Sequence, residues 1–492
     1  MKKRLIFLII ISVFACSSIA WAGYDEGITA YNAGNYLKAL QEWLPLANNG
    51  NSQAQTYLGL MYDNGYGVPQ NKVEAVKWYR NAAEQGYAQA QYNLGVMYEN
   101  GEGVVQDNVE AVRWYQRASA QGRVQAQYNL GGMYDKGKGV TKNKAEAAKW
   151  YLMAAEKGYA PAQSNLGFLY DKGQGVAESK LEAVKWYSKA AEQGLAQAQY
   201  NLGVIFNNTQ NKAEAVKWFS KAAEQGHAEA EAILAFIYFS GDGVVQNKAT
   251  ALKLYRDSAA QGSVLAQSNL GYMYEHGDGV AKNKVEAVRL YRAAAEQGDA
   301  KAQYNLGVMF YNGEGTPQNK VEAVQWFGKA AEQGHANAQY NLGLMFYDGE
   351  GVAQNKAEAV KWFGKAAEQG VAKAQFHLGL MYDKGDSVAQ NKVEAVKLYR
   401  EVAEQGDAVA QYNLGVMYYN GEGVAQNKAE AVKWFGKAAE QGHANAQYNL
   451  GLMFYDGEGV SKNKVEAVKW IGRAAEQGHA KAQNTLKKIL EE

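Results

Sequence analysis

Cysteine and proline are scarce in this chain of 492 residues, which contains one cysteine and four prolines. Because Cys16 is the only cysteine and lies near the N-terminus, no intramolecular disulfide can form. The stability of the folded chain must therefore come from packing. Nearly half of the residues are apolar and about a fifth are charged, a composition typical of folded soluble proteins.

An excess of charge of either sign is also missing. Lysine and arginine together number 51, against 50 aspartates and glutamates. Such a balance provides no electrostatic footprint for nucleic acid or for an acidic membrane surface. We therefore expect no nucleic-acid partner. Beyond the N-terminal leader no stretch is apolar enough to cross a bilayer, so we expect no transmembrane segment.

Residues 1–22 have the pattern of a cleavable signal peptide. Met1 to Arg4 is basic, Leu5 to Ala15 is an apolar run too short to span a membrane, and Ala20-Trp21-Ala22 is a small-x-small cleavage site. The pattern predicts a mature chain that begins at Gly23, in the periplasm or secreted. The alternative is a lipoprotein leader acylated at Cys16, which Phe14 and the lack of a flexible tether disfavour.

The rest of the chain repeats a leucine-glycine step, almost always at intervals of 36 residues. Twelve units carry this marker; one of them has Ala235 in place of glycine, 32 residues after the preceding marker. The glycines of the other eleven are Gly59, Gly95, Gly131, Gly167, Gly203, Gly271, Gly307, Gly343, Gly379, Gly415 and Gly451. Periods of this length indicate stacked structural repeats.

Each unit is predicted to be a pair of helices. In the first helix Ala90, Leu94 and Tyr98 form an apolar stripe at helical spacing, and glycines follow where the helix should stop. The second helix begins at a cap such as Asn71, with Glu74 three residues later, the pattern of a capping box that satisfies N–H groups at both ends. We interpret the marker glycine as the point where the second helix presses on the first.

One such pair cannot bury its own apolar faces, so the pairs should stack. The sequence predicts an all-α solenoid of about twelve 36-residue helix pairs with capping helices at both ends. We assign residues 23–492 to one solenoid, with an N-terminal helix pair at 23–50, repeats at 51–478 and a C-terminal capping helix at 479–492. Eight residues instead of twelve separate Gly203 from the cap Asn211, which predicts a shortened loop without a domain boundary.

The pattern A-x-x-x-L-G-x-x-Y-x-x-G-x-G-V, followed by E-A-x-x-W-Y-x-x-A-A-x-x-G, resembles the Sel-1-like repeat family. The resemblance covers essentially the whole mature chain. It implies a right-handed α/α superhelix, related to tetratricopeptide repeats, that serves as an adaptor in assembling complexes. Bacterial members of the family are associated with signalling, the cell envelope and contact with host cells. Some secreted members carry a disulfide in each repeat, and this chain departs from them.

Candidate catalytic and metal-binding residues are interpreted as structural. Ser461 and Lys464 fit the S-x-x-K pattern of β-lactamases and penicillin-binding proteins, but no Ser-Asp-Asn or Lys-Thr-Gly follows. Four histidines follow the glycine that ends a second helix, and we expect them to be solvated turn residues, not metal ligands: His227, His335, His443 and His479. The Gly-x-Gly loops lack the context of a phosphate site. We expect no enzyme activity and no cofactor.

Two rows of first-helix residues lie outside the apolar stripe and are the candidate partner-binding residues. The asparagine row includes Asn93, Asn129, Asn201, Asn305, Asn341, Asn413 and Asn449. The aromatic row directly before it includes Tyr92, Tyr128, Tyr304, Tyr340, Tyr412 and Tyr448. An asparagine amide can both donate to and accept from a peptide backbone. The alternative is a local hydrogen bond that keeps neighbouring repeats in register.

These observations predict a non-enzymatic scaffold, monomeric in itself, that binds a protein or peptide partner after export. An envelope-structural or host-interaction role is the first alternative, and a cell-wall-directed enzyme is the second. Residues 301–370 and 409–478 are almost identical in sequence. Copying of whole modules suits a scaffold better than an active site, because catalysis needs particular residues placed once.

Overall fold

The computed structural model describes residues 23–491, and the predictions made for the leader, including cleavage after Ala22 and acylation of Cys16, lie outside them. Every regular element in this range is a helix, and residues 23–491 contain no β-strand. The all-α prediction is therefore confirmed. The chain divides after Gln246 into two compact units, each of which is described by itself.

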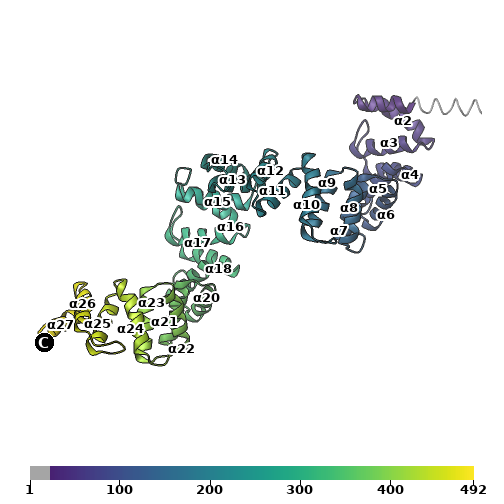
Figure 1. The fold of residues 1–492 in the computed structure, drawn as a ribbon. Coiled ribbons are helices and arrows are strands. Elements are labelled where there is room, and N and C mark those ends of the chain that lie inside the picture. Colours follow the sequence, from purple (N-terminus) through teal and green to yellow (C-terminus); the bar gives the residue numbers. More distant parts are fainter. Residues whose placement is uncertain (1–22, 492) are drawn as a thin grey trace, which may run out of the picture. The chain divides into compact units, whose positions relative to one another are not determined.

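In the first unit residues 23–32 are helical and are followed by α2 (Tyr36–Asn48). First and second helices then alternate (Figure 1). Their bounds are α3 (Ser52–Asn64), α4 (Lys72–Glu84), α5 (Ala88–Asn100), α6 (Asn108–Ala120), α7 (Val124–Lys136), α8 (Lys144–Glu156), α9 (Ala160–Lys172), α10 (Lys180–Glu192), α11 (Ala196–Asn208), α12 (Lys212–Glu224) and α13 (Ala228–Ser240).

The second unit continues the alternation and ends on a helix of twelve residues. Its bounds are α14 (Lys248–Ala260), α15 (Val264–His276), α16 (Lys284–Glu296), α17 (Ala300–Asn312), α18 (Lys320–Glu332), α19 (Ala336–Asp348), α20 (Lys356–Glu368), α21 (Ala372–Lys384), α22 (Lys392–Glu404), α23 (Ala408–Asn420), α24 (Lys428–Glu440), α25 (Ala444–Asp456), α26 (Lys464–Glu476) and α27 (Ala480–Glu491).

Within each unit a second helix packs on two first helices, its own and the next. Thus α6 contacts both α5 and α7, and α18 contacts both α17 and α19. In each repeat, the alanines and the leucine of the predicted apolar stripe are buried between these helices, as Ala90 and Leu94 show. The predicted stacking of helix pairs is confirmed inside both units.

The marker glycine lies directly under a large side chain of the second helix, which is an aromatic ring except at Gly451, where it is Ile471. A Cβ atom on Gly95 would lie 2.7 Å from Cδ1 of Tyr115. The N-terminal pair repeats the arrangement, since a Cβ atom on Gly27 would lie 2.2 Å from Nε1 of Trp43. Real Cβ atoms do not approach other atoms so closely, and the predicted close contact between the helices is therefore confirmed.

The helix ends follow the sequence signals, with one exception. The Asn71 side chain accepts a hydrogen bond from the Glu74 amide (3.1 Å), as predicted. The return bond of a capping box is not formed, because the Asn71 amide already donates to the carbonyl of Tyr62 (2.8 Å). The Glu74 carboxylate instead pairs with Lys77. The first part of the capping prediction is confirmed and the second is wrong.

The Gly-x-Gly loops connect neighbouring repeats. Gly101 ends α5 in a left-handed conformation, and Gly103 lies so close to the Lys72 backbone that a Cβ atom would be 2.2 Å from its carbonyl oxygen. The acidic residue between the glycines pairs with a lysine of the preceding repeat. These inter-repeat pairs are Lys72–Glu102, Lys212–Asp242, Lys248–Asp278, Lys284–Glu314, Lys320–Glu350, Lys356–Asp386, Lys392–Glu422 and Lys428–Glu458.

Buried glutamines form a second connection between helices. Gln303 of α17 donates to the carbonyl of Ala295 (3.0 Å), and its oxygen accepts from Gln333 at the end of α18 (2.7 Å). The same glutamine–glutamine bond recurs through both units. Burial of an unpaired amide is costly, so these paired bonds specify one register.

The short repeat keeps both of its helices. Helix α11 has thirteen residues like its neighbours, and a turn with Gln210 at φ 62° connects it to α12. The predicted shortened loop is confirmed. The division between the compact units falls after Gln246 and not at this loop.

Candidate interaction surface

The aromatic row lies on the first helices as half-buried rings. Tyr92 packs on Tyr115 with ring centroids 6.0 Å apart, and Tyr304 packs on Phe327 at 5.9 Å. Equivalent contacts place Tyr128, Tyr340 and Tyr412 on Tyr151, Phe363 and Phe435, and Tyr448 lies beside His479 at 4.8 Å. One side of each ring thus supports the repeat, and the remainder stays accessible.

The asparagine row has two different environments. In several repeats whose preceding second helix carries a tyrosine, the asparagine amide meets its hydroxyl: Asn129 Nδ2 donates to the Tyr115 hydroxyl (3.1 Å). Asn93, Asn201 and Asn305 lie in the same way beside Tyr79, Tyr187 and Tyr291. In these repeats the local structural interpretation fits the contacts.

Asn341 and Asn449 have no such hydroxyl, because the corresponding second-helix residues are Phe327 and Phe435. Each of the two asparagines lines a pocket together with the nearby phenylalanine. The Asn449 amide therefore remains available for a ligand, whereas the Asn341 amide meets the hydroxyl of Tyr304 on the neighbouring first helix. Asn413 occupies the same row on α23.

Neighbouring first helices bring the two rows together. Tyr304 of α17 and Tyr340, Asn341 and Asn337 of α19 line one open pocket of about 570 Å³, closed on its far side by Lys373 of α21. Residues 36 apart in sequence thus contribute to one surface. We name the surface formed by the tyrosine and asparagine rows the first-helix face.

The four turn histidines also contribute to this face. His335 caps α19, accepting the Ala338 amide at Nδ1 (3.2 Å), and its ring stacks on Tyr304 at 4.6 Å. His227, His443 and His479 cap their helices in the same way. The prediction of solvated turn residues is wrong, since these rings are half-buried. Burial lowers the pKa of His335 and His443 below the ordinary value.

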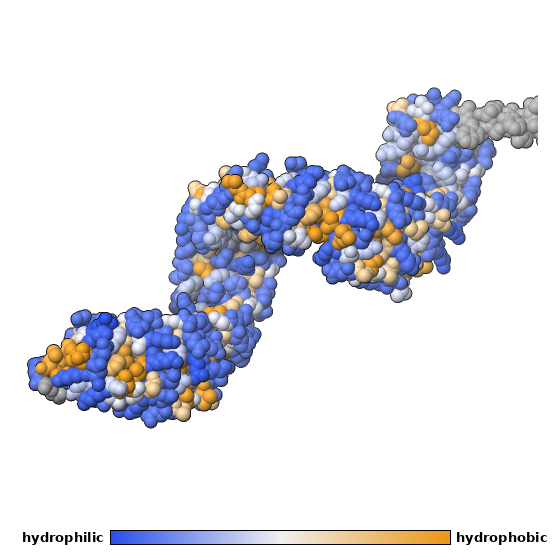
Figure 2. Space-filling model, in the orientation of Figure 1, coloured by the Kyte–Doolittle hydropathy of each residue, from blue (hydrophilic) through white to orange (hydrophobic). Residues whose placement is uncertain are grey.

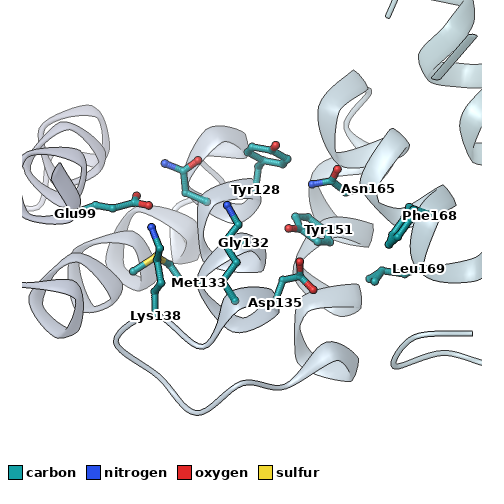
Figure 3. Close-up of a pocket in the computed structure, with 12 residues that line it drawn as sticks. Glu99, Tyr128, Gly132, Met133, Asp135, Lys138, Tyr151, Asn165, Phe168 and Leu169 are labelled. Atoms are coloured by element: carbon teal, nitrogen blue, oxygen red, sulfur yellow. The ribbon is translucent and has the colours of Figure 1, made fainter. Parts of the chain in front are cut away.

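A pocket of about 410 Å³ opens beside Gly132 of α7 (Figure 3). Asn165 and Phe168 lie on one side of it and Glu99 on the opposite side. In the other eleven repeats this helix position holds valine, leucine, phenylalanine or tyrosine. A Cβ atom on Gly132 would meet only the Tyr151 hydroxyl, at 3.7 Å. The missing side chain therefore widens the pocket, since the equivalent pockets lined by Val204 and Leu452 have volumes of about 290 Å³ and 250 Å³.

The surface is mostly hydrophilic, with separate apolar patches on the visible face (Figure 2). Tryptophans contribute little to it: Trp326 and Trp434 are buried, as are Leu290 and Leu398 at the same position. The cationic group of Lys329 lies 4.0 Å from the centroid of the Trp326 ring. These side chains therefore serve packing between the helices.

The candidate catalytic residues Ser461 and Lys464 do not line any of the pockets described above. Ser461 and Lys464 are exposed, the serine in a repeat loop and the lysine at the start of α26. Residues 23–491 hold no group of three or more histidine, cysteine or acidic side chains placed to bind a metal. Over the same range, no helix combines the length and the apolar character that crossing a membrane requires.

Comparison with known proteins identifies the repeat. The family model for the Sel1 repeat matches twelve consecutive segments, the first at residues 52–87 and the last at 444–479. The chain belongs to the Sel1 repeat family. The family model covers all twelve marked units, including the one with Ala235 at residues 228–263.

Solved structures agree with this assignment. The chain is similar to a protective antigen present in uropathogenic Escherichia coli strains, which displays an SLR fold: 36% identity, 91% of this chain and 90% of that chain covered, TM-score 0.56. It is also similar to a Sel1 repeat protein from Oxalobacter formigenes, at 35% identity over 50% of this chain and 96% of that one, with TM-score 0.42. No curated protein matches the chain.

Two sets of residues escaped the sequence analysis. The buried glutamines that follow the pattern A-x-A-Q were passed over, although their 36-residue recurrence was a signal of a structural role. The exchange of tyrosine for phenylalanine in the second helix was also missed. It accompanies an exchange in the first helix. Where the second helix carries Tyr115, the first helix carries Glu99, which accepts a hydrogen bond from the tyrosine hydroxyl. Where the second helix carries Phe327, the position equivalent to Glu99 holds Tyr311.

Proposed function

We propose that this Sel1 repeat protein is a non-catalytic scaffold that binds an extended segment of a partner protein along the first-helix face. The observation that carries the proposal is the shared pocket of Tyr304, Tyr340 and Asn341, because it connects the rows of consecutive repeats. An extended peptide presents backbone donors and acceptors at regular intervals, and amide side chains can satisfy both. Each such exposed bond contributes about 0.5–1.5 kcal/mol, so several in a row are needed.

We further propose that the mature chain starts at Gly23 and acts in the periplasm or after secretion. The small-x-small site before the first described helix supports this location. Intact mass of the exported protein tests it, and a chain that begins at a lipid-modified Cys16 would refute it.

A role in contact with host cells is the second candidate. It is favoured by the similarity to a protein described as a protective antigen of uropathogenic E. coli. Surface accessibility on intact cells, measured with an antibody against the mature chain, separates this role from a purely periplasmic one.

The central experiment uses the two environments of the asparagine row. A partner is captured with the mature chain from its own source, and its affinity is measured for two double variants. Asn341→Ala with Asn449→Ala should weaken binding about 5-fold to 100-fold and change the melting temperature little, because neither side chain meets a buried tyrosine hydroxyl of a second helix and Asn341 meets only the half-buried Tyr304. Asn129→Ala with Asn305→Ala should lower the melting temperature instead.

Gly132→Val provides an independent test at a different repeat. Valine occupies this position in other repeats, for example Val96 and Val204, so the variant should fold and gain helix stability of a few tenths of a kcal/mol or more. It should also narrow the pocket of about 410 Å³. If neither this variant nor the Asn341–Asn449 pair changes partner affinity, the partner binds elsewhere and the proposed surface is wrong.

A further inference from the structure

Two pockets in the second unit are built from the same seven residue types. They have volumes of about 110 Å³ and 250 Å³. The first is lined by Tyr311, Phe327, Asn341, Leu344, Met345, Asp348 and Glu350, and the second by Tyr419, Phe435, Asn449, Leu452, Met453, Asp456 and Glu458. Each residue of the second set follows its counterpart by 108 positions, which is three repeats.

The polar contacts of the two pockets also agree. The Tyr311 hydroxyl donates to Glu350 at 2.8 Å, and Lys320 pairs with the same carboxylate at 2.6 Å. In the second pocket Tyr419 donates to Glu458 at 2.7 Å, and Lys428 pairs with it at 2.7 Å. The glutamates are thus neutralised within the protein.

The aspartates have no partner of this kind. Asp348 and Asp456 are exposed, and in the part of the chain that the structure describes neither carboxylate forms a hydrogen bond or an ion pair. Each of the two aspartates is the last residue of its first helix. The helix dipole disfavours a negative charge at that end. The other repeats hold only asparagine, lysine, serine or histidine at this position.

In the repeat that follows the first pocket, the position equivalent to Asp348 carries a positive charge. Tyr347 and Lys356 meet Asp386 there as in the two pockets. However, His377 replaces the asparagine and Lys384 replaces the aspartate. A cation that suits the two aspartate pockets would be repelled at this repeat, so the chain itself contains a matched negative control.

We propose that the two aspartate pockets bind two arginine side chains of one partner segment, so that the partner is held at two points three repeats apart. A guanidinium is planar, donates in a fork to a carboxylate, and packs well against aromatic and aliphatic side chains. Asp348 supplies the charge, the Asn341 oxygen supplies a further acceptor, and Tyr311 and Leu344 form the walls. The inference rests on the proposed function and specifies the chemistry of the partner.

Synthetic peptides test the proposal with the whole mature chain. One series carries two arginines separated by glycine-serine spacers of increasing length, and control peptides carry one arginine or two glutamates. Two-point binding should make the best two-arginine peptide at least about 10-fold tighter than the one-arginine peptide. Affinity should fall as the salt concentration rises, and the glutamate peptide should not bind.

Asp348→Asn and Asp456→Asn are the matched variants. Asparagine is natural at this position in five repeats, so the melting temperature should hold. Each single variant should reduce the affinity for the two-arginine peptide to that for the one-arginine peptide, and the double variant should abolish binding. Lys384→Asp combined with His377→Asn should create a third pocket and strengthen binding at a new optimal spacer length.

Equal affinity of the one-arginine and two-arginine peptides at every spacer, or unchanged binding in the double variant, would overturn the inference. Failure here is distinguishable from failure of the proposed function. If a captured partner depends on Asn341 and Asn449 but not on Asp348 and Asp456, the first-helix face binds the partner and only the arginine assignment falls.

Discussion

Gly307 and Phe327 are in contact in a way that leaves no room for a side chain: a Cβ atom on the glycine would lie 2.7 Å from Cδ1 of the ring. The same relationship joins the marker glycine to the second helix in the other repeats of both units that carry it. One side chain of each second helix must therefore arrive over one particular residue of the first, and the short repeat keeps this contact between Gly203 and Phe219.

Replacing Gly307 with alanine should therefore destabilise the protein. Overpacking against Phe327 costs about 1–3 kcal/mol, which exceeds the gain of about 1 kcal/mol from removing a glycine from a helix. Gly328 of α18 is the control, because no atom lies within 4 Å of its Cβ position, and Gly328→Ala should stabilise. The urea midpoint of unfolding is measured for both variants and compared with that of the parent protein. Equal shifts of the two midpoints would contradict the close contact between Gly307 and Phe327.

The buried glutamine bonds predict a large effect from a substitution of similar size. Gln303→Leu removes the donor to the Ala295 carbonyl and the acceptor of Gln333. Leaving these groups unpaired should cost about 1–3 kcal/mol. The expected observable is a lower urea midpoint together with faster amide exchange at the junction of α16 and α17. A variant as stable as the parent would show that the bond has no role in register.

Ser387 occupies a loop position at which other repeats carry glycine. Its φ is 62°, in the left-handed region, and its hydroxyl bonds only to the adjacent Asp386. Ser387→Gly should stabilise the protein by about 1 kcal/mol, because a side chain in this conformation is strained. Gly351→Ser is the reverse experiment: its Cβ would lie 2.3 Å from the Lys320 carbonyl oxygen, and it should destabilise. Melting temperatures that move in the same direction would refute this account.

The histidine caps predict a pH dependence. Burial lowers the pKa of His335 and His443 in the folded protein, and the neutral Nδ1 accepts a backbone amide. The unfolded chain therefore binds protons first as the pH falls below about 6.5. Stability is full above that pH, declines toward the lowered folded pKa, and declines no further below it.

Amide exchange at Ala338 measures this effect locally. Exchange should accelerate between pH 7.5 and pH 5.5, after correction for the intrinsic rate. Asp299 and Lys301 face the ring in both the parent and the control. The control is His335→Asn, which keeps a capping oxygen without a titrating group in this range. A parent and control with the same pH profile would show that the histidine proton plays no part.

Much of the fold could be read from the sequence because each signal is local. The stripe of Ala90 and Leu94, the cap at Asn71 and the glycine at Gly101 act within one or two helical turns, and all three occur where they were predicted. The packing role of the marker glycine was also accessible, because the residue that replaces it inside the array, Ala235, is also small.

The sequence by itself thus determined the helices, their pairing and the repeat. Tertiary structure alone decided the reciprocal bond of the cap, which fails because the Asn71 amide is already occupied by Tyr62. It also decided which asparagines support the structure. Asn129 and Asn341 are equivalent in sequence, and their contacts differ because the facing residue, fourteen positions earlier on another helix, is Tyr115 in one case and Phe327 in the other. Asn129 meets the buried Tyr115 hydroxyl, whereas Asn341 meets only the half-buried Tyr304. The availability of a side chain depends on such contacts between helices, whereas the helix itself depends on neighbours along the chain.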